Sequence, residues 1–304
     1  MTTALLDRLA PPVDDATRRE FLIGGLSLAA LIAGCGAPDA DPPTPAGSDN
    51  GRFPVTIEHK YGSTEITDEP KRVVTVGVTD QDPVLALGVT PVAMVNWRGS
   101  PFFPWNVDLV GALHPAELSD TSESINVEEV AAQGPDLIFA LWSNLSKREY
   151  QLLSQIAPVV APDGDYPAFG TPWQVTTRVA GKALGRSEQA DQLIADVETQ
   201  IADIKAQHPD LEGKNVTIAA DFGDGQLNVT DVVLWIVLPD ANIQQNPLYL
   251  AQPVHQLGRD IFLDTNTGLA LTFGSVLSIP YAAKRLAAQL TAAADSDPTT
   301  EVTP

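Results

Sequence analysis

Short β-branched runs alternate with helical segments along most of this chain, and this alternation constrains the fold more than any other feature. Residues 71–78 read Lys-Arg-Val-Val-Thr-Val-Gly-Val, which is typical of a strand buried on both faces of a sheet. A Thr79-Asp80 pair then opens a helical segment that stops near Gly88. Further strand signals occupy residues 91–96, 136–142 and 157–161, with a helical stretch at 127–133. Strands that alternate with helices predict parallel βαβ units.

The longest helical signal covers residues 171–208 and is interrupted once, at Gly185-Arg186. After a restart at Ser187, apolar residues recur at helical spacing. They are Leu193, Ile194, Val197, Ile201 and Ile204. A second α/β region follows, with strand signals at 215–222 and 260–264 and a final helix near 281–290. We therefore expect an α/β protein of two Rossmann-like lobes joined by one long, stiff helix.

The sequence divides into six segments on these signals. Residues 1–34 form an export signal, and residues 35–52 form a flexible linker that begins with a cysteine. The linker is rich in Pro, Asp, Gly, Ser and Ala, so it cannot bury enough apolar surface to become ordered. The N-terminal lobe occupies 53–168, the interlobe helix 169–210, the C-terminal lobe 211–293 and a disordered polar tail 294–304.

The N-terminus carries the signs of an exported lipoprotein. Arg18 and Arg19 precede an apolar run of 14 residues, 21–34, as in a twin-arginine signal. A membrane span needs about 20 apolar residues, so this run is a signal core rather than a span. The run ends in Leu-Ile-Ala-Gly-Cys, which resembles the lipobox of bacterial lipoproteins, with Cys35 as the acylated residue. The alternative is that Cys35, the only cysteine, is a small buried apolar residue.

The formal net charge of −21 limits the partners of the chain. Nucleic acid is an improbable partner, because binding to it depends on Lys and Arg neutralising phosphates. Anionic membrane surfaces would repel the protein as well, so membrane association has to come from acyl chains on Cys35. We expect the protein at the extracytoplasmic face of the cytoplasmic membrane, anchored by lipid.

Four short motifs give the chain a family resemblance. They are Pro-Lys-Arg-Val-Val at 70–74, Leu-Ala-Leu-Gly-Val-Thr-Pro-Val at 85–92, Pro-Asp-Leu-Ile at 135–138 and Leu-Ser-Ile-Pro-Tyr at 277–281. In this order they resemble the periplasmic-binding-protein-type receptors of ferric-siderophore, haem and cobalamin ABC importers. The resemblance implies a monomer that holds a ferric siderophore between two lobes and delivers it to an ABC permease. It implies no cofactor, since iron would enter only as a chelate.

One departure from the family pattern concerns the C-terminal lobe. The family usually places several tens of residues between segments like 226–230 and 231–238, which abut here. Parallel neighbours need a crossover of about a dozen residues or more, so this lobe is predicted to be truncated. The alternative is one long edge strand, or a hairpin through the Gly-Asp-Gly turn at 223–225. Truncation would leave an uncovered apolar edge near residues 232–235.

Aromatic side chains near predicted strand ends are the candidate ligand contacts, because rings suit planar chelating groups. The candidates are Trp97, Trp105 and Trp142 in the first lobe and Phe222, Trp235 and Phe273 in the second. For each Trp the alternative is a core residue that caps the sheet. Arg98 is the basic residue near those strand ends and a candidate partner for an anionic chelate, with solvated surface as its alternative. Asp80 is a further candidate, with a helix cap as its alternative.

Direct metal binding and catalysis are both disfavoured. The four histidines, His59, His114, His208 and His255, lack ligand spacing and are expected at the surface. A haem receptor remains an alternative, with Tyr166 or Tyr281 as the axial ligand, although both tyrosines fit a packing role better. The chain has no G-x-S-x-G, P-loop or metalloprotease motif, so we expect a protein that is not an enzyme. A degenerate receptor or envelope scaffold is the other alternative.

Replacing Cys35 with Ser should abolish lipid attachment after twin-arginine export. The Arg pair and the lipobox motivate this expectation, because the cysteine thiol is the group that would be acylated. The measurement is membrane fractionation together with the intact mass of the mature protein. A variant that stays in the membrane fraction with unchanged mass would contradict lipidation.

Overall fold

The computed structural model describes residues 51–97, 99–100, 102–111, 113–121, 124–219, 231–236 and 243–295. The predicted export signal, Cys35, Arg98, Phe222 and nearly all of the polar tail lie outside these residues. Within the described part of the chain, no helix has the length and apolar character needed to cross a membrane.

The described chain opens with an antiparallel hairpin, β1 (Val55–His59) and β2 (Gly62–Ile66). Alternate residues of β1 point inward, so that Val55 and Ile57 join the core of the first lobe together with Ile66. This hairpin was not among the predicted elements.

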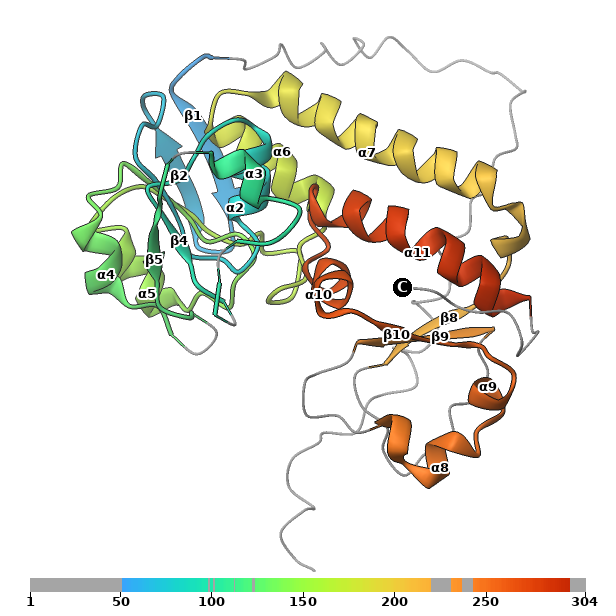
Figure 1. Ribbon diagram of the computed structural model, residues 1–304. Helices are drawn as coiled ribbons and strands as arrows, with labels where there is room; N and C mark the ends of the chain where they lie inside the picture. Colours follow the sequence, from blue (N-terminus) through green and yellow to red (C-terminus); the bar gives the residue numbers. More distant parts are fainter. Residues whose placement is uncertain are drawn as a thin grey trace, which may run out of the picture. The chain divides into compact units, whose positions relative to one another are not determined.

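The first lobe contains a parallel sheet in the order β5-β4-β3-β6-β7. Figure 1 labels β4 and β5 of this sheet. Its strands are β3 (Val73–Thr75), β4 (Ala93–Val95), β5 (Ala116–Leu118), β6 (Leu137–Phe139) and β7 (Val159–Val160). The residues of β3, β4 and β6 are buried on both faces, which confirms the strands predicted from their β-branched and apolar runs. The short strand β5 was not predicted.

Helices cover both faces of this sheet. They are α2 (Gln81–Ala86), α3 (Val107–Val110), α4 (Val127–Ala132) and α5 (Lys147–Leu153). Val73 and Leu137 face a core cluster shared with the hairpin and with Val84 of α2. Their neighbours Val74 and Ile138 face the opposite cluster, where α4 and α5 pack. The alternation along each strand therefore builds a core on each side of the sheet.

The predicted long helix is present as two helices, α6 (Trp173–Ala183) and α7 (Ser187–Gln207). The chain turns at Gly185, whose φ of +67° is a conformation that favours glycine. A Cβ there would also lie 3.0 Å from the ring of Phe53. The interruption predicted at Gly185-Arg186 is thus confirmed. A 3₁₀ turn, η1 (Pro209–Leu211), follows α7.

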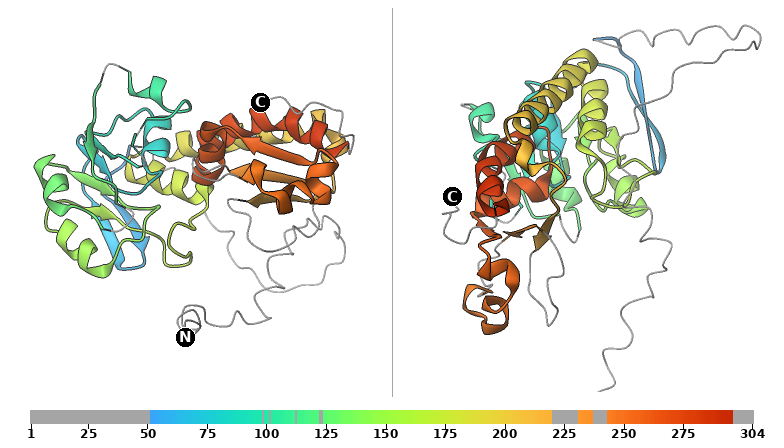
Figure 2. Two further views of the ribbon diagram at one scale, coloured as in Figure 1. Left: turned by 60° about the horizontal axis from the view of Figure 1, so that its bottom comes forward. Right: turned by 90° about the vertical axis from the view of Figure 1, so that its right-hand side faces the viewer.

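The described part of the second lobe contains a parallel sheet, drawn in orange in Figure 2, and its strand order is β10-β9-β8. Its strands are β8 (Val216–Ala219), β9 (Val232–Ile236) and β10 (Asp260–Leu263). Residues of α10 (Thr265–Phe273) and α11 (Ser278–Ala294) pack on one face of β9. The other face packs on a 3₁₀ turn, η2 (Ile243–Gln245), and two short helices, α8 (Pro247–Leu250) and α9 (Pro253–Gln256).

Two expectations for this lobe are wrong. Strands β8 and β9 pair in parallel, so they form neither one long strand nor a hairpin through residues 223–225. Residues 232–235, expected at an uncovered edge, lie in the central strand of the three and are at most 3% exposed. The outer strands are β8 and β10, and on β8 the side chains of Val216 and Ile218 are 43% and 56% exposed. A missing crossover remains a prediction, because residues 220–230 lie outside the described part.

Gly77, in the segment after β3, lies against the buried carboxylate of Asp80. A Cβ at this position would be 2.2 Å from Asp80 Oδ2, a distance that no side chain could keep. The sequence therefore needs glycine here for close approach.

Replacing Gly77 with Ala should lower the free energy of unfolding by about 1–3 kcal/mol, because Asp80 or the backbone would have to shift. Urea unfolding followed by tryptophan emission measures the change. The matched control is Gly164→Ala, where a Cβ would make only ordinary contact at 3.5 Å and φ is not positive. Equal stability of the two variants would contradict the close-approach argument.

Candidate ligand-binding site

The first-lobe sheet has a topological switch point between β3 and β6, since β4 and β5 continue to one side and β7 to the other. Ligands of open parallel sheets bind outside the carboxyl ends of the strands at such a point. Here the two strand ends stay hydrogen-bonded beyond the sheet, with a shift of one residue in register. The N–H of Val76 donates to Phe139 O at 2.8 Å, and that of Val78 donates to Trp142 O at 3.1 Å.

Asp80 bridges the two strand ends at the switch point. Its fully buried carboxylate accepts the backbone N–H groups of Leu141 at 2.7 Å and Trp142 at 2.9 Å. Burial raises the pKa of Asp80 to about 6, although these N–H groups oppose the rise. The side chain makes no hydrogen bond that caps α2. The sequence suggested that Asp80 lines a cleft or caps the helix, and the structure shows neither role. Asp80 instead positions the loop that carries Trp142.

Aromatic rings from both lobes meet beside this point. Phe273, at the end of α10, lies against Trp97, Phe103 and Trp105, with ring centroids 5.1, 4.9 and 5.5 Å away. Phe103 and Trp105 stack on each other at 4.8 Å, and Trp105 also contacts Tyr281 of α11 at 5.5 Å. We call these five residues the junction cluster. It brings together three of the predicted contacts, Trp97, Trp105 and Phe273.

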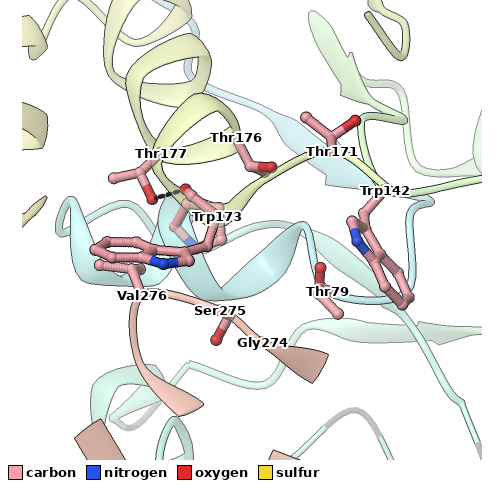
Figure 3. A pocket seen from close by; sticks show the side chains of 10 residues that line it. Thr79, Trp142, Thr171, Trp173, Thr176, Thr177, Gly274, Ser275 and Val276 are labelled. Atoms are coloured by element: carbon pink, nitrogen blue, oxygen red, sulfur yellow. Dashed lines mark hydrogen bonds between the residues drawn. The ribbon is translucent and has the colours of Figure 1, made fainter. Parts of the chain in front are cut away.

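Trp142, also a predicted contact, pairs with Phe169 in an edge-to-face contact at 5.2 Å. Phe169 is the only non-glycine residue with positive φ in the described ranges, at +57°. Such strained positions often occur at functional sites. Trp142 also lines a small pocket with Thr79, Thr171 and Ser275 (Figure 3). The pocket volume is about 10 Å³, room for one water at most, so a larger ligand requires these side chains to separate.

A second buried carboxylate, Asp82 of α2, joins the junction cluster to the second lobe. Its Oδ1 accepts the Nδ2–H of Asn106 at 2.8 Å, and its Oδ2 accepts the Nε1–H of Trp105 at 2.9 Å. Oδ2 also accepts the hydroxyl of Ser275 at 2.5 Å, across 193 residues of sequence. Burial raises the pKa of Asp82 to about 6, and these donors oppose the rise.

Trp235 lies away from the junction cluster. Val232 and Leu234 lie on the face of β9 that packs in one core with the junction cluster. Val233 and Trp235 lie on the other face, against α8 and α9. Trp235 is fully buried and donates its Nε1–H to Tyr249 Oη at 3.0 Å. We therefore assign Trp235 to the core of the second lobe. Arg98 and Phe222 cannot be placed, since both lie outside the described residues.

The prediction that all four histidines lie at the surface is wrong. His59 is buried, with Nε2 2.9 Å from Thr64 Oγ1, and His255 Nδ1 lies 2.8 Å from Asp260 Oδ2. In the part of the chain that the structure describes, no group of three or more His, Cys, Asp or Glu side chains could hold a metal ion.

Several residues of the site were missed by sequence reasoning. Phe103 and Asn106 belong to an aromatic loop, Phe-Phe-Pro-Trp-Asn at 102–106, whose density of rings between two strands was a usable signal. Phe169 and Ser275 carry no comparable local signal, because their contacts depend on chain segments far away in sequence.

Two α/β lobes, joined by a long helical connector and meeting through aromatic side chains at strand ends, define the class of two-lobed solute-binding proteins. Comparison with family models matches residues 78–229 to the family described as periplasmic binding protein. This match covers half of the sequence. The chain belongs to the periplasmic binding protein family, whose members here are binding proteins and not enzymes.

Curated relatives match over part of their length. The probable siderophore-binding lipoprotein YfiY of Bacillus subtilis is 27% identical over 188 residues, covering 60% of this chain and 55% of YfiY. The achromobactin-binding periplasmic protein of Dickeya dadantii is 33% identical over 140 residues, covering 45% and 43%. The chain spans about half the length of the curated relatives it matches.

Known structures match over nearly their whole length. A periplasmic solute-binding protein of Mycobacterium smegmatis is 30% identical with a TM-score of 0.73, covering 78% of this chain and 97% of that one. Streptococcus pneumoniae PiaA in complex with ferrichrome is 23% identical with a TM-score of 0.65, covering 80% and 99%. The latter supports the fold alone. Such cover does not confirm a missing crossover in the second lobe.

Replacing Asp82 with Asn should change how stability depends on pH. Burial raises the pKa of Asp82 from 3.8 to about 6. Between about pH 4 and 6 the folded protein therefore holds a proton on Asp82 that the unfolded chain has already released. The Asp82 contribution to the free energy of unfolding therefore falls as pH rises through this window, by at most about 1.4 kcal/mol per pH unit.

The measurement is urea unfolding of wild type and D82N from pH 4 to 7. Other titrating groups, including Asp80, are common to both proteins, so the difference between the two free energies isolates Asp82. A difference that stays constant across the window would show that Asp82 titrates normally.

Proposed function

We propose that this protein is an extracytoplasmic binding lipoprotein that captures a ferric siderophore between its lobes and passes it to an ABC permease. The junction cluster carries the proposal. It brings Trp97 and Trp105, which follow β4 of the first-lobe sheet, against Phe273 of the second lobe. Rings contributed by both lobes suit a ligand that is gripped from two sides.

A chelate fits this site better than a bare ion. Aromatic rings offer large contact areas to flat chelating groups, while the described residues offer no cluster of metal ligands. Iron would therefore arrive with its own ligands. The names of similar proteins point the same way: YfmC of Bacillus subtilis is called Fe(3+)-citrate-binding, and the Dickeya dadantii relative is called achromobactin-binding. These names differ in their chelate, so the proposal extends to the ferric chelate class.

Export and lipid anchoring complete the proposed function. The Arg18-Arg19 pair and the Cys35 lipobox support them, and YfiY carries the word lipoprotein in its name. A lipid anchor would keep the receptor beside its permease although the protein carries a net charge of −21.

Titration with ferric citrate, a ferric hydroxamate and a ferric phenolate complex tests the function. At least one chelate should quench the tryptophan emission saturably, and Trp105→Ala or Phe273→Ala should weaken its binding about tenfold or more. Trp235→Phe is the control, because Trp235 lies on the far face of β9 and its loss should leave the affinity unchanged. Tighter binding of free Fe³⁺ than of every chelate would refute the proposal, and no binding at all would favour a scaffold.

A further inference from the structure

Asp82 is a buried charge whose partners come from both lobes. We propose that Asp82 is the positioning residue of ligand uptake: its carboxylate fixes the Trp105 side of the junction cluster and ties the Ser275 turn of the second lobe to it. This inference rests on the proposed function, because it concerns the same site. It predicts that the hydrogen bond between Asp82 and Ser275 has to break before a chelate can enter.

On the first-lobe side, Asp82 sets the position of two stacked rings. One carboxylate oxygen holds the indole N–H of Trp105 and the other holds the amide N–H of Asn106. Asn106 in turn accepts the backbone N–H of Phe103 at 2.8 Å, so the loop carrying both rings is pinned at three points. Two side-chain donors and the bond within the loop hold this side of Asp82, whereas the second lobe contributes only the Ser275 hydroxyl, so this is the firmer half of the arrangement.

On the second-lobe side, the carboxylate meets the turn between α10 and α11. The Ser275 hydroxyl donates to Asp82 and accepts the backbone N–H of Ser278 at 3.0 Å. Ser278 Oγ accepts the N–H of Ser275 at 2.9 Å and donates to Ala270 O at 2.8 Å. The turn is thus closed on itself at the N-terminus of α11, where the helix dipole favours a nearby carboxylate.

Phe273 lies two residues before Ser275, which links this turn to the ring contacts. If Phe273 moves away with its turn, the hydrogen bond from Ser275 to Asp82 breaks. If Trp105 moves with Phe273 instead, the bond from its own indole to Asp82 breaks, and the pinned loop has to follow. Ligand pockets usually have volumes of about 300–1,000 Å³, far above the 10 Å³ of the pocket that Trp142 and Ser275 line. Opening is therefore needed, and the Ser275 contact is the one that yields.

The first test needs no ligand. Indole N–H signals are recorded by NMR for wild type, Asp82→Asn and Ser275→Ala, with Trp105→Phe used to assign the Trp105 signal. D82N should shift the Trp105 signal, because the amide cannot accept from all three donors. S275A should move that signal much less than D82N, because Trp105 keeps its charged acceptor. An unchanged Trp105 signal in D82N would overturn the positioning role.

The second test measures association rates by stopped flow, with whichever of the three ferric chelates binds wild type most tightly. S275A should associate about tenfold faster, as expected for losing a hydrogen bond to a charged group. Ser143→Ala is the matched control: Ser143 is as buried as Ser275, at 5% exposure, but donates to Ala140 O within the first lobe. An S275A rate equal to that of wild type, or an equal acceleration in S143A, would show that the hydrogen bond between Asp82 and Ser275 does not control ligand entry.

The two proposals fail in different ways. If wild type binds none of the chelates, the proposed function is wrong, while the indole signals still decide whether Asp82 positions Trp105. If chelates bind but S275A leaves the association rate unchanged, the proposed function stands, and the proposal that the Asp82–Ser275 hydrogen bond limits ligand entry is wrong. S275A also keeps the test valid should D82N not fold.

Discussion

The rest of the structure depends on the pair of hydrogen bonds that Asp80 accepts from the backbone of Leu141 and Trp142. At a switch point the connections after neighbouring strands leave in opposite directions, so the sheet itself cannot hold them together. Asp80 spans this opening, and Gly77 leaves the space that its carboxylate needs. With the two strand ends fixed, α2 begins at a defined place and directs Asp82 toward the second lobe.

Asp80 and Asp82 are buried carboxylates two residues apart in the sequence, and each would lower the stability of the fold if it lacked hydrogen-bond donors. Each has several donors, yet burial still raises both pKa values to about 6. Burying the two carboxylates therefore lowers the free energy of unfolding near neutral pH, but it fixes the positions of the side chains around them. Asp80 orders contacts within one lobe, whereas Asp82 orders contacts between lobes. Retaining both charges is understandable if the relative position of Trp105, Trp142 and Phe273 matters more than maximal stability.

Local sequence patterns predicted what local physics determines. The β-branched run of β3, the apolar run of β6 and the interruption at Gly185 were predictable because strand burial and helix termination depend on neighbouring residues. Strand β5 was missed because three residues with an exposed Glu117 carry no such pattern. Trp235 was misplaced because a continuous apolar run does not show which face each residue takes. The Asp82–Ser275 contact joins residues 193 positions apart, and no local pattern encodes it.

The lobes contribute unequally to the site. In the first lobe, the rings of Phe103 and Trp105 are fixed by buried hydrogen bonds on a five-stranded sheet. The described part of the second lobe has exposed apolar residues on β8, and an apolar groove of about 910 Å³ lies between α7 and α11. The second lobe contacts the rings of the first lobe through Phe273 and Tyr281, and it contacts Asp82 through Ser275. A ligand would therefore be selected mainly by the fixed first-lobe wall and retained by the ring that the second lobe brings down on it.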